Sequence, residues 1–323
     1  MTITEIKLPR LTNKPPKFKE LVYPKPRDEN IQKPYYVCIA AGSRGTGKSY
    51  SIVRCIKNQE VTGGFYDPDT NNKVPIRTIL MSPTVEGNPI FTALDSLDET
   101  DIINDYSHAK LQEILSELKY EKEKTKEWKD YLKAWTTFSK MTPEQFYRWK
   151  DDDAIALLYA KDFMNPKDLE PPKYPDGVVC NIILDDCLSS DAFSSKKGNV
   201  LLKSVLNGRH YGINLFIAAQ NLKSVNKAIR GNTELFMLFK FCSMKIVLDD
   251  LYPEISALVT EDQFIDIYAH ATQDDHDCLV IDKKAEKGKQ FKRNLDVVLS
   301  FDNKKDKKEI TETPVDKKNI EIK

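Results

Sequence analysis

Six short apolar runs lie along this chain, separated by amphipathic or charged stretches. They cover residues 35–41, 78–81, 178–184, 213–219, 235–239 and 278–281. Runs that are apolar at consecutive positions are typical of strands buried on both faces of a parallel sheet. Residues 50–56, directly after the first run and a short loop, instead have apolar side chains at helical spacing. The pattern predicts an α/β fold with a mostly parallel sheet flanked by helices.

A charged, helical pattern interrupts this alternation between about residues 105 and 165. Two apolar stripes at helical spacing run along it: Leu111, Ile114, Leu115 and Leu118, then Trp128, Tyr131, Leu132, Trp135 and Phe138. Such stripes predict a helical insertion in the core. We expect the aromatic side chains to pack between antiparallel helices; the alternative is a surface on which nucleic-acid bases stack.

The two ends of the chain lack both patterns. Residues 1–33 are rich in Pro and Lys, which disfavours helix and predicts an extended N-terminal arm that packs on a neighbouring subunit. Residues 303–323 are charged and poor in apolar side chains, which predicts a disordered tail. The core is then residues 34–302, with the insertion inside it.

Composition excludes few functions. The 49 basic and 49 acidic residues balance, so a nucleic-acid partner must be bound by local patches. The six cysteines lie mostly inside apolar runs without metal-ligand spacing, so we expect reduced thiols and neither zinc nor disulfides. No run approaches the roughly 20 apolar residues of a membrane span, and the N-terminus lacks a signal-peptide core. We expect a soluble protein that is not secreted.

A phosphate-binding motif follows the first apolar run. It consists of Gly42, Ser43, Arg44, Gly45, Thr46, Gly47, Lys48 and Ser49, which match G-x-x-x-x-G-K-[ST]. The match lies between a predicted strand and a predicted helix, a context that a chance match in a loop would lack. We expect ATP here, with Lys48 on the β- and γ-phosphates, Ser49 on Mg²⁺, and Tyr50 completing the nucleotide-binding segment.

Polar side chains end two later runs. Asp185 and Asp186 follow residues 178–184, and Gln220 follows residues 213–219. Since the carboxyl ends of parallel strands meet at one edge of a sheet, we expect Asp185 to hold Mg²⁺ and Asp186 to orient the attacking water, with Gln220 sensing the γ-phosphate. The alternatives are a helix cap for the aspartates and simple solvent exposure for Gln220. This order predicts a P-loop NTPase with a RecA-like core.

Several further segments resemble one superfamily in spacing and order. Besides the phosphate loop, they are residues 80–84, 183–186, 208–213, 218–220, 229–232 and 291–294. Together they resemble the FtsK–HerA superfamily of DNA-pumping ATPases, and within it the genome-packaging ATPases of large double-stranded DNA viruses and virophages, of the poxvirus type. The resemblance covers roughly residues 34–300, outside the insertion. Asp186 stands where most such ATPases have Glu.

The resemblance implies a ring of subunits around duplex DNA. In such rings an arginine of one subunit enters the nucleotide site of the next, and the matching position here is Arg209, with Arg230 as a second candidate. The alternative is that Arg209 pairs with an acidic side chain on its own helix. For DNA contact we expect lysines that touch phosphates without reading bases: Lys196, Lys197, Lys223 and Lys227, the last two one helical turn apart. A solvated charged face is the alternative for each lysine.

These patterns predict an ATP-driven translocase that packages double-stranded DNA into a viral capsid. The expected partners are DNA, further copies of the chain in a pentameric or hexameric ring, and capsid or inner-membrane assembly proteins, in the host cytoplasm at the virus factory and in the virion. One alternative is a same-fold ATPase of conjugation, repair or segregation. Another is a P-loop switch or small-molecule kinase in which the insertion is a lid. The insertion has one arginine, Arg148, which argues against a lid that closes on phosphates.

Overall fold

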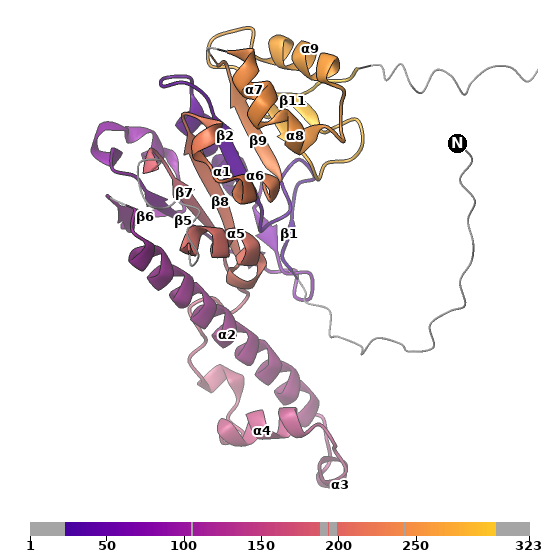
Figure 1. Cartoon of the computed structure of the whole chain (residues 1–323). Coiled ribbons are helices and arrows are strands. Elements are labelled where there is room, and N and C mark those ends of the chain that lie inside the picture. The colour runs from indigo at the N-terminus through magenta and orange to yellow at the C-terminus, as the bar shows by residue number, and fades with distance from the viewer. Residues whose placement is uncertain (1–22, 105, 188–192, 194–198, 242, 302–323) are drawn as a thin grey trace, which may run out of the picture.

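A nine-stranded sheet forms the centre of the computed structural model, which describes residues 23–301 except 105, 188–192, 194–198 and 242 (Figure 1). The strand order is β12-β11-β10-β9-β2-β8-β7-β5-β6. Six strands are parallel: β2 Val37–Ala41, β5 Ile76–Met81, β6 Leu97–Ile103, β7 Val179–Leu184, β8 Ile213–Ala219 and β9 Leu235–Phe239. Three antiparallel strands extend one side: β10 Cys278–Asp282, β11 Phe291–Arg293 and β12 Val297–Val298. The predicted α/β class, with a mostly parallel sheet, is confirmed.

Helices cover both faces of this sheet, because its central strands are apolar on both sides. In β2, Cys38 and Ala40 face α1 Lys48–Val61 and the short helix η2 Pro89–Ala93. Val37 and Ile39 face the opposite layer. That layer contains α2 His108–Phe138, α5 Val200–Tyr211, α6 Lys227–Gly231, α7 Met244–Asp250, α8 Tyr252–Ile255 and α9 Glu261–Ala271. The continuous apolar runs therefore reflect burial in a three-layer fold.

Strand β6 was not predicted. It reads Leu-Asp-Glu-Thr-Asp-Ile-Ile and pairs only with β5, at the edge of the sheet. Asp98, Glu99 and Thr100 are exposed in it. An edge strand keeps one side in water and needs no apolar run, so the signal used for the other strands was missing.

The N-terminal arm begins to pack on its own chain. Strand β1, Lys25–Pro26, pairs antiparallel with β3, Phe65–Tyr66, which pairs with β4, Lys73–Val74. The chain is therefore extended near Pro26, as expected, but this segment pairs with a strand of its own chain. Residues 1–22 and the tail from 302 lie outside the described residues.

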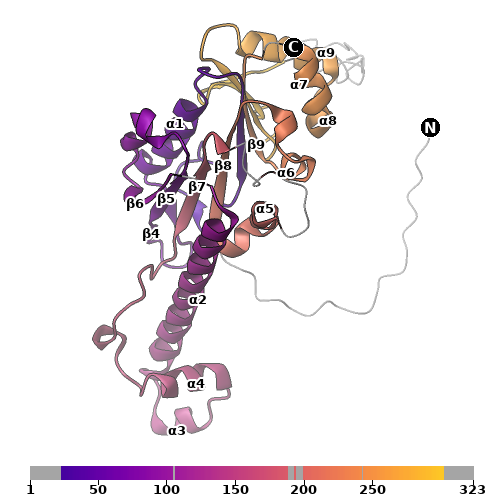
Figure 2. The same ribbon diagram turned by 60° about the vertical axis from the view of Figure 1, so that its left-hand side comes forward.

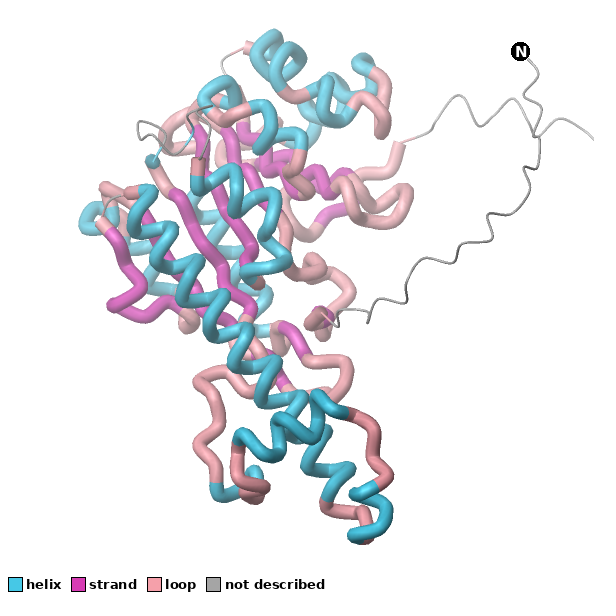
Figure 3. The backbone as a smooth tube through the Cα atoms, turned by 60° about the horizontal axis from the view of Figure 1, so that its bottom comes forward, coloured by secondary structure: helices cyan, strands magenta, loops and turns pink. Residues whose placement is uncertain are grey.

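The insertion forms a helical arm that projects from the core (Figures 1, 2 and 3). Its members are the second half of α2, α3 Pro143–Tyr147 and α4 Asp152–Ala160. Tyr131 of α2 and Leu158 of α4 are fully buried in a separate core there. The ring of Phe138 lies 5.1 Å from that of Phe163, centroid to centroid. Tyr131, Trp135 and Phe138 of the stripe pack in this core, as predicted, whereas Leu132 is exposed.

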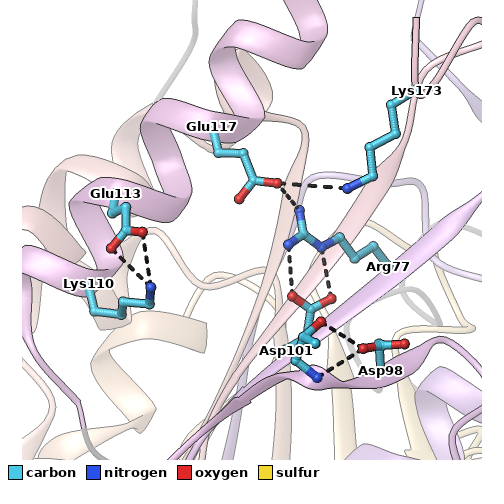
Figure 4. A network of polar contacts seen from close by, with 8 residues as sticks. Arg77, Asp98, Asp101, Lys110, Glu113, Glu117 and Lys173 are labelled. Atoms are coloured by element: carbon cyan, nitrogen blue, oxygen red, sulfur yellow. Dashed lines mark hydrogen bonds and ion pairs between the residues drawn. The ribbon is translucent and has the colours of Figure 1, made fainter.

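The root of α2 is tied to the sheet by an ionic network (Figure 4). Arg77 of β5 donates to both carboxylate oxygens of Asp101 in β6, at 2.7 and 2.9 Å, and to Glu117 of α2 at 2.8 Å. The hydrogen bonds to Asp101 raise the pKa of Arg77 above its usual range. Lys173, in the segment that returns from the arm, approaches Glu117 at 4.0 Å. The arm is thus anchored where α2 leaves the sheet.

Two short helices, η1 Val85–Gly87 and η6 Leu222–Ser224, follow β5 and β8, and η3 Pro166–Asp168 lies in the return from the arm. None of the helices in the described part of the chain combines the length and the apolar composition that crossing a bilayer requires.

Candidate nucleotide site

The phosphate loop occupies the turn between β2 and α1. Gly45 and Gly47 have φ of 78° and 99°, a left-handed conformation that glycine adopts without strain. A Cβ added at Gly42 would lie 2.5 Å from Cβ of Phe239, so a larger residue does not fit there. The hydroxyl of Thr46 donates to the carbonyl of Ser43 at 2.8 Å and closes the turn. The backbone turn, the contact with Phe239 and the Thr46 hydrogen bond therefore account for the three glycines and for Thr46.

Lys48, the first residue of α1, lies across this loop. Its Nζ donates to the carbonyl oxygens of Gly42 at 3.0 Å and Ser43 at 2.8 Å. Burial lowers the pKa of Lys48, while the charges of Asp185 and Asp186 act in the opposite direction. The ammonium group is therefore held at the mouth of the loop, where a phosphate oxygen is its natural partner.

Asp185 reaches the phosphate loop from the end of β7. The Ser49 hydroxyl donates to its carboxylate, at 3.1 Å from Oδ1 and 3.2 Å from Oδ2. Burial raises the pKa of Asp185, although the bond from Ser49 lowers it. A buried carboxylate beside a hydroxyl, with a lysine nearby, offers hard oxygen ligands for a divalent cation. Among the described residues no group of three or more His, Cys, Asp or Glu side chains suits a metal, so such an ion would need ligands from the nucleotide and water.

Asp186 and Gln220 form a second pair in the same place. Nε2 of Gln220, after β8, donates to Oδ1 of Asp186 at 2.7 Å. Asp186 has φ of 55°, which is uncommon for a residue other than glycine. The carboxamide and the carboxylate together present acceptors and a donor to the space in front of Lys48.

One cavity of about 690 Å³ joins these groups. It is lined by Lys48, Ser49, Asp185, Asp186 and Gln220, all predicted from the sequence, and by Arg44 and Gly45 of the loop. The far wall, Pro83, Thr84, Val85, Gly87, Asn88 and Asn104, was missed as part of the site. Thr84 follows β5, which was predicted, so the rule that parallel strands end at one edge already pointed to it. Asn104 follows β6 and would have been found only if β6 had been recognised.

A second cavity of about 490 Å³ lies on the other side of the loop. Ser43, Arg44, Gly45 and Thr46 line it together with Lys240, Phe241, Asp274, Asp275, His276 and Asp277. It shares Arg44 and Gly45 with the first cavity. The phosphate loop therefore has space on both sides. No sequence signal had pointed to residues 274–277.

The motif at residues 291–294 holds this second wall. Arg293 donates to Asp277 at 2.8 Å through Nε and to Asp274 at 2.5 Å. Asn294 donates to the other oxygen of Asp277 at 2.8 Å and accepts from the backbone N–H of Cys278 at 3.2 Å. A Cβ added at Gly47 would lie 3.6 Å from Cβ of His276, so this wall packs against the phosphate loop.

Arg209 lies far from the site of its own chain. It is exposed on the last turn of α5, directly before β8, whereas Gln220 follows the opposite end of β8. The seven residues of β8 span about 23 Å, so the two positions lie near opposite ends of this strand. Its side chain therefore cannot serve the same subunit's nucleotide.

Arg230 is bound within its own chain. Its Nη1 donates to the carbonyl oxygens of Leu222 at 2.8 Å and Val225 at 2.9 Å. These contacts fix the segment after Gln220. Its role as a second finger candidate stays a prediction.

The lysines expected on DNA are arranged differently from the prediction. Lys223 belongs to η6 and Lys227 begins α6, so the two are on separate short helices and not one turn apart on a single helix. Asn221 is the N-cap of the first and Asn226 the N-cap of the second, so a new helix begins between the two lysines. Both lysines are exposed, as is Tyr50 beside the phosphate loop. Lys196 and Lys197 lie outside the described residues.

No protein-family model and no curated protein matches this chain. Solved structures do. The genome packaging NTPase B204 from Sulfolobus turreted icosahedral virus 2, in complex with sulfate, is 14% identical, with a TM-score of 0.43 over 84% of this chain and 100% of B204. EssC (ATPases 2 and 3) from Geobacillus thermodenitrificans is 12% identical, with a TM-score of 0.38 over 84% of this chain and 40% of EssC. The N-terminal domain of zonular occludens toxin from Neisseria meningitidis is 14% identical, with a TM-score of 0.31 over 65% of this chain and 78% of that domain.

Proposed function

We propose that this chain is an ATP-hydrolysing, ring-forming motor that moves double-stranded DNA into a viral capsid. The observation that supports it best is the contact between Ser49 and Asp185, at 3.1 Å, in a cavity that Lys48, Asp186 and Gln220 also face. Phosphate binding needs only the loop. Hydrolysis also needs a place for a cation and a group that orients water, and this cavity offers both.

Magnesium fits the pair of Ser49 and Asp185. The ion would replace the hydrogen bond between them and draw its other ligands from phosphate oxygens and water, as Mg²⁺ commonly does. It would neutralise charge that develops on the phosphates. The raised pKa of Asp185 reflects a buried charge that a cation would stabilise.

The two cavities suggest how ATP lies. With its phosphates in the loop and the γ-phosphate toward Asp185, the nucleoside would enter the second cavity, beyond Ser43 and Arg44. Exposed Asp275 there is an acceptor suited to ribose hydroxyls. Gln220 bonded to Asp186 would respond to the γ-phosphate, because the same carboxamide can donate to a phosphate oxygen and release the carboxylate to water.

The position of the arm argues against a kinase lid. The phosphate loop lies at the carboxyl edge of the sheet, whereas α2 crosses the amino edge, where Thr125 donates to the carbonyl of Tyr174 at 2.5 Å, shortly before β7. The 31 residues of α2 span about 46 Å, and its second half extends away from β2 and α1, which flank the phosphate loop (Figure 1). Arg148, at the end of α3, is part of this distant tip.

Ring formation is supported by the same geometry. Arg209 is exposed and lies at the end of β8 opposite to Gln220, so any nucleotide site that it completes would belong to a neighbour. An arginine supplied in trans is worth about 10³ to 10⁵ in rate in phosphoryl transfer. Four further parts of the proposal rest on the motif resemblance alone. They are packaging of a viral genome, a pentameric or hexameric ring, capsid or inner-membrane partners, and location at the virus factory.

Stimulation of ATP turnover by duplex DNA tests the proposal. We expect turnover to rise with DNA and the rise to weaken with salt, since phosphate contacts release counterions. The Lys48→Ala variant should bind no ATP productively and give no turnover with the fold retained. Absence of stimulation at every salt concentration would favour a switch or kinase, and turnover by Lys48→Ala would mean that the loop is not the site.

Mixing two inactive variants tests the ring. Lys48→Ala and Arg209→Ala subunits should together recover part of the activity, because some interfaces then join an intact Lys48 to an intact Arg209. Failure to recover at every mixing ratio would refute a finger acting between subunits.

A further inference from the structure

The turn that carries Arg209 is held by a side chain of α2. Nζ of Lys122 donates to the carbonyl oxygen of Arg209 at 2.6 Å. The same ammonium lies 5.8 Å from the centroid of the Tyr35 ring, and burial lowers the pKa of Lys122. Lys122 therefore gives up part of its hydration to bind one backbone atom of α5.

That turn is a separate piece of α5. Asn207 has φ of −115° and ψ of 16°, which breaks the helix before it. Gly212, with φ of 77°, ends the helix and donates to the carbonyl of Gly208 at 2.8 Å. The last carbonyls of a helix have no partner within the helix, and a lysine beside them is favourable. Lys122 of α2 binds the short stretch between the break at Asn207 and the cap at Gly212, through the carbonyl oxygen of Arg209.

The same helix α2 carries the projecting arm. Glu117 of α2 accepts a hydrogen bond from Arg77 of the sheet at 2.8 Å (Figure 4). Five residues later, Lys122 binds α2 to α5. Beyond Lys122, α2 continues to Phe138 and packs on α4. Helix α2 thus carries the arm at its C-terminal end and contacts the Arg209 turn near its own middle, at Lys122.

We propose that Lys122 is a positioning residue for Arg209 and that, through it, the helical arm sets how the guanidinium is presented to the neighbouring subunit. This inference rests on the proposed role of Arg209 between subunits. It assigns the arm, which lies outside the motif resemblance, a part in controlling turnover: a partner that displaces the arm would move the finger.

Three single variants of the full chain test the inference, with duplex DNA present. Lys122→Met removes the ammonium and keeps an unbranched apolar side chain, Lys122→Arg keeps a donor, and Lys126→Met is the matched control, because Lys126 is exposed one turn later on α2. We expect Lys122→Met to lower kcat about tenfold, as a small displacement of a catalytic group does. KM for ATP should not change, since the variant's own nucleotide site is intact. Lys122→Arg should keep most of the activity and Lys126→Met all of it.

Combination with other variants separates positioning from a general structural role. Lys122→Met mixed with Lys48→Ala should recover activity, because the first supplies the nucleotide site and the second a well-placed Arg209. Lys122→Met mixed with Arg209→Ala should not recover. The double variant of Lys122→Met with Arg209→Ala should be no slower than Arg209→Ala alone.

Several outcomes would overturn the inference. A further loss in the double variant, an equal loss in Lys126→Met, or a Lys122→Met defect that Lys48→Ala subunits cannot complement would each show that Lys122 acts otherwise. A slow Arg209→Ala beside a fully active Lys122→Met would refute the positioning role and leave the proposed function intact. Full activity in Arg209→Ala would refute the finger itself, and the positioning role with it.

Discussion

Removal of Arg77 should destabilise the protein strongly, although it lies outside the nucleotide site. The Arg77 and Asp101 side chains are only 15% and 11% exposed, and Arg77 is the donor to both oxygens of Asp101. In Arg77→Met, Asp101 would remain as a buried charge without its partner. Breaking a buried pair in this way costs about 3 to 5 kcal/mol. For a domain of this size, that corresponds to a fall in Tm of roughly 10 °C.

The matched controls use the other members of the network. Glu117 is 41% exposed, so Glu117→Gln should cost less than about 1 kcal/mol. Combining Arg77→Met with Asp101→Leu should recover most of the stability, because a buried ion pair can be replaced by apolar side chains at little cost. Urea unfolding followed by circular dichroism would measure all three variants. If Arg77→Met cost no more than Glu117→Gln, or if Asp101→Leu deepened its loss, the desolvation argument would be wrong.

Three further predictions concern the two cavities. Burial raises the pKa of Asp185, so the folded state binds this proton more tightly than the unfolded state does, and the ionised carboxylate lowers stability at neutral pH. Asp185→Asn should therefore abolish turnover but raise the Tm of the nucleotide-free protein at pH 7.5, and this gain should shrink as the pH falls. A lower Tm at pH 7.5 would contradict the argument. Gln220→Ala should lower kcat about tenfold with little change in KM, because Asp186 loses the partner that orients it. Steady-state kinetics measure both constants, and a raised KM with an unchanged kcat would show that Gln220 only binds substrate. Arg293→Gln should raise KM for ATP and leave hydrolysis of inorganic triphosphate unchanged, because Arg293 holds Asp277 at the wall of the second cavity, where we propose that the nucleoside binds. Equal losses with both substrates would show that Arg293 does not act through nucleoside binding.

The main site could be predicted because its members follow strands whose order is visible in the sequence. Parallel strands with apolar runs must be buried, and their carboxyl ends then meet at one edge. Lys48, Asp185 and Gln220 accordingly converge, although 172 positions separate the first from the last. The edge strand β6 escaped prediction because half of it faces water, and Asn104 was lost from the site with it.

The sequence by itself therefore determined the chemistry of the phosphate loop and of the groups opposite it, because local patterns encode both strand burial and turn geometry. Only the tertiary structure decided that the helical insertion points away from the nucleotide, that residues 291–294 support a second cavity, that Arg230 binds its own chain, and that Lys122 holds the Arg209 turn. Each of these depends on contacts between segments that lie far apart in the sequence or belong to different elements. Such contacts are fixed by how whole elements pack, and no local pattern of apolar and polar residues records them.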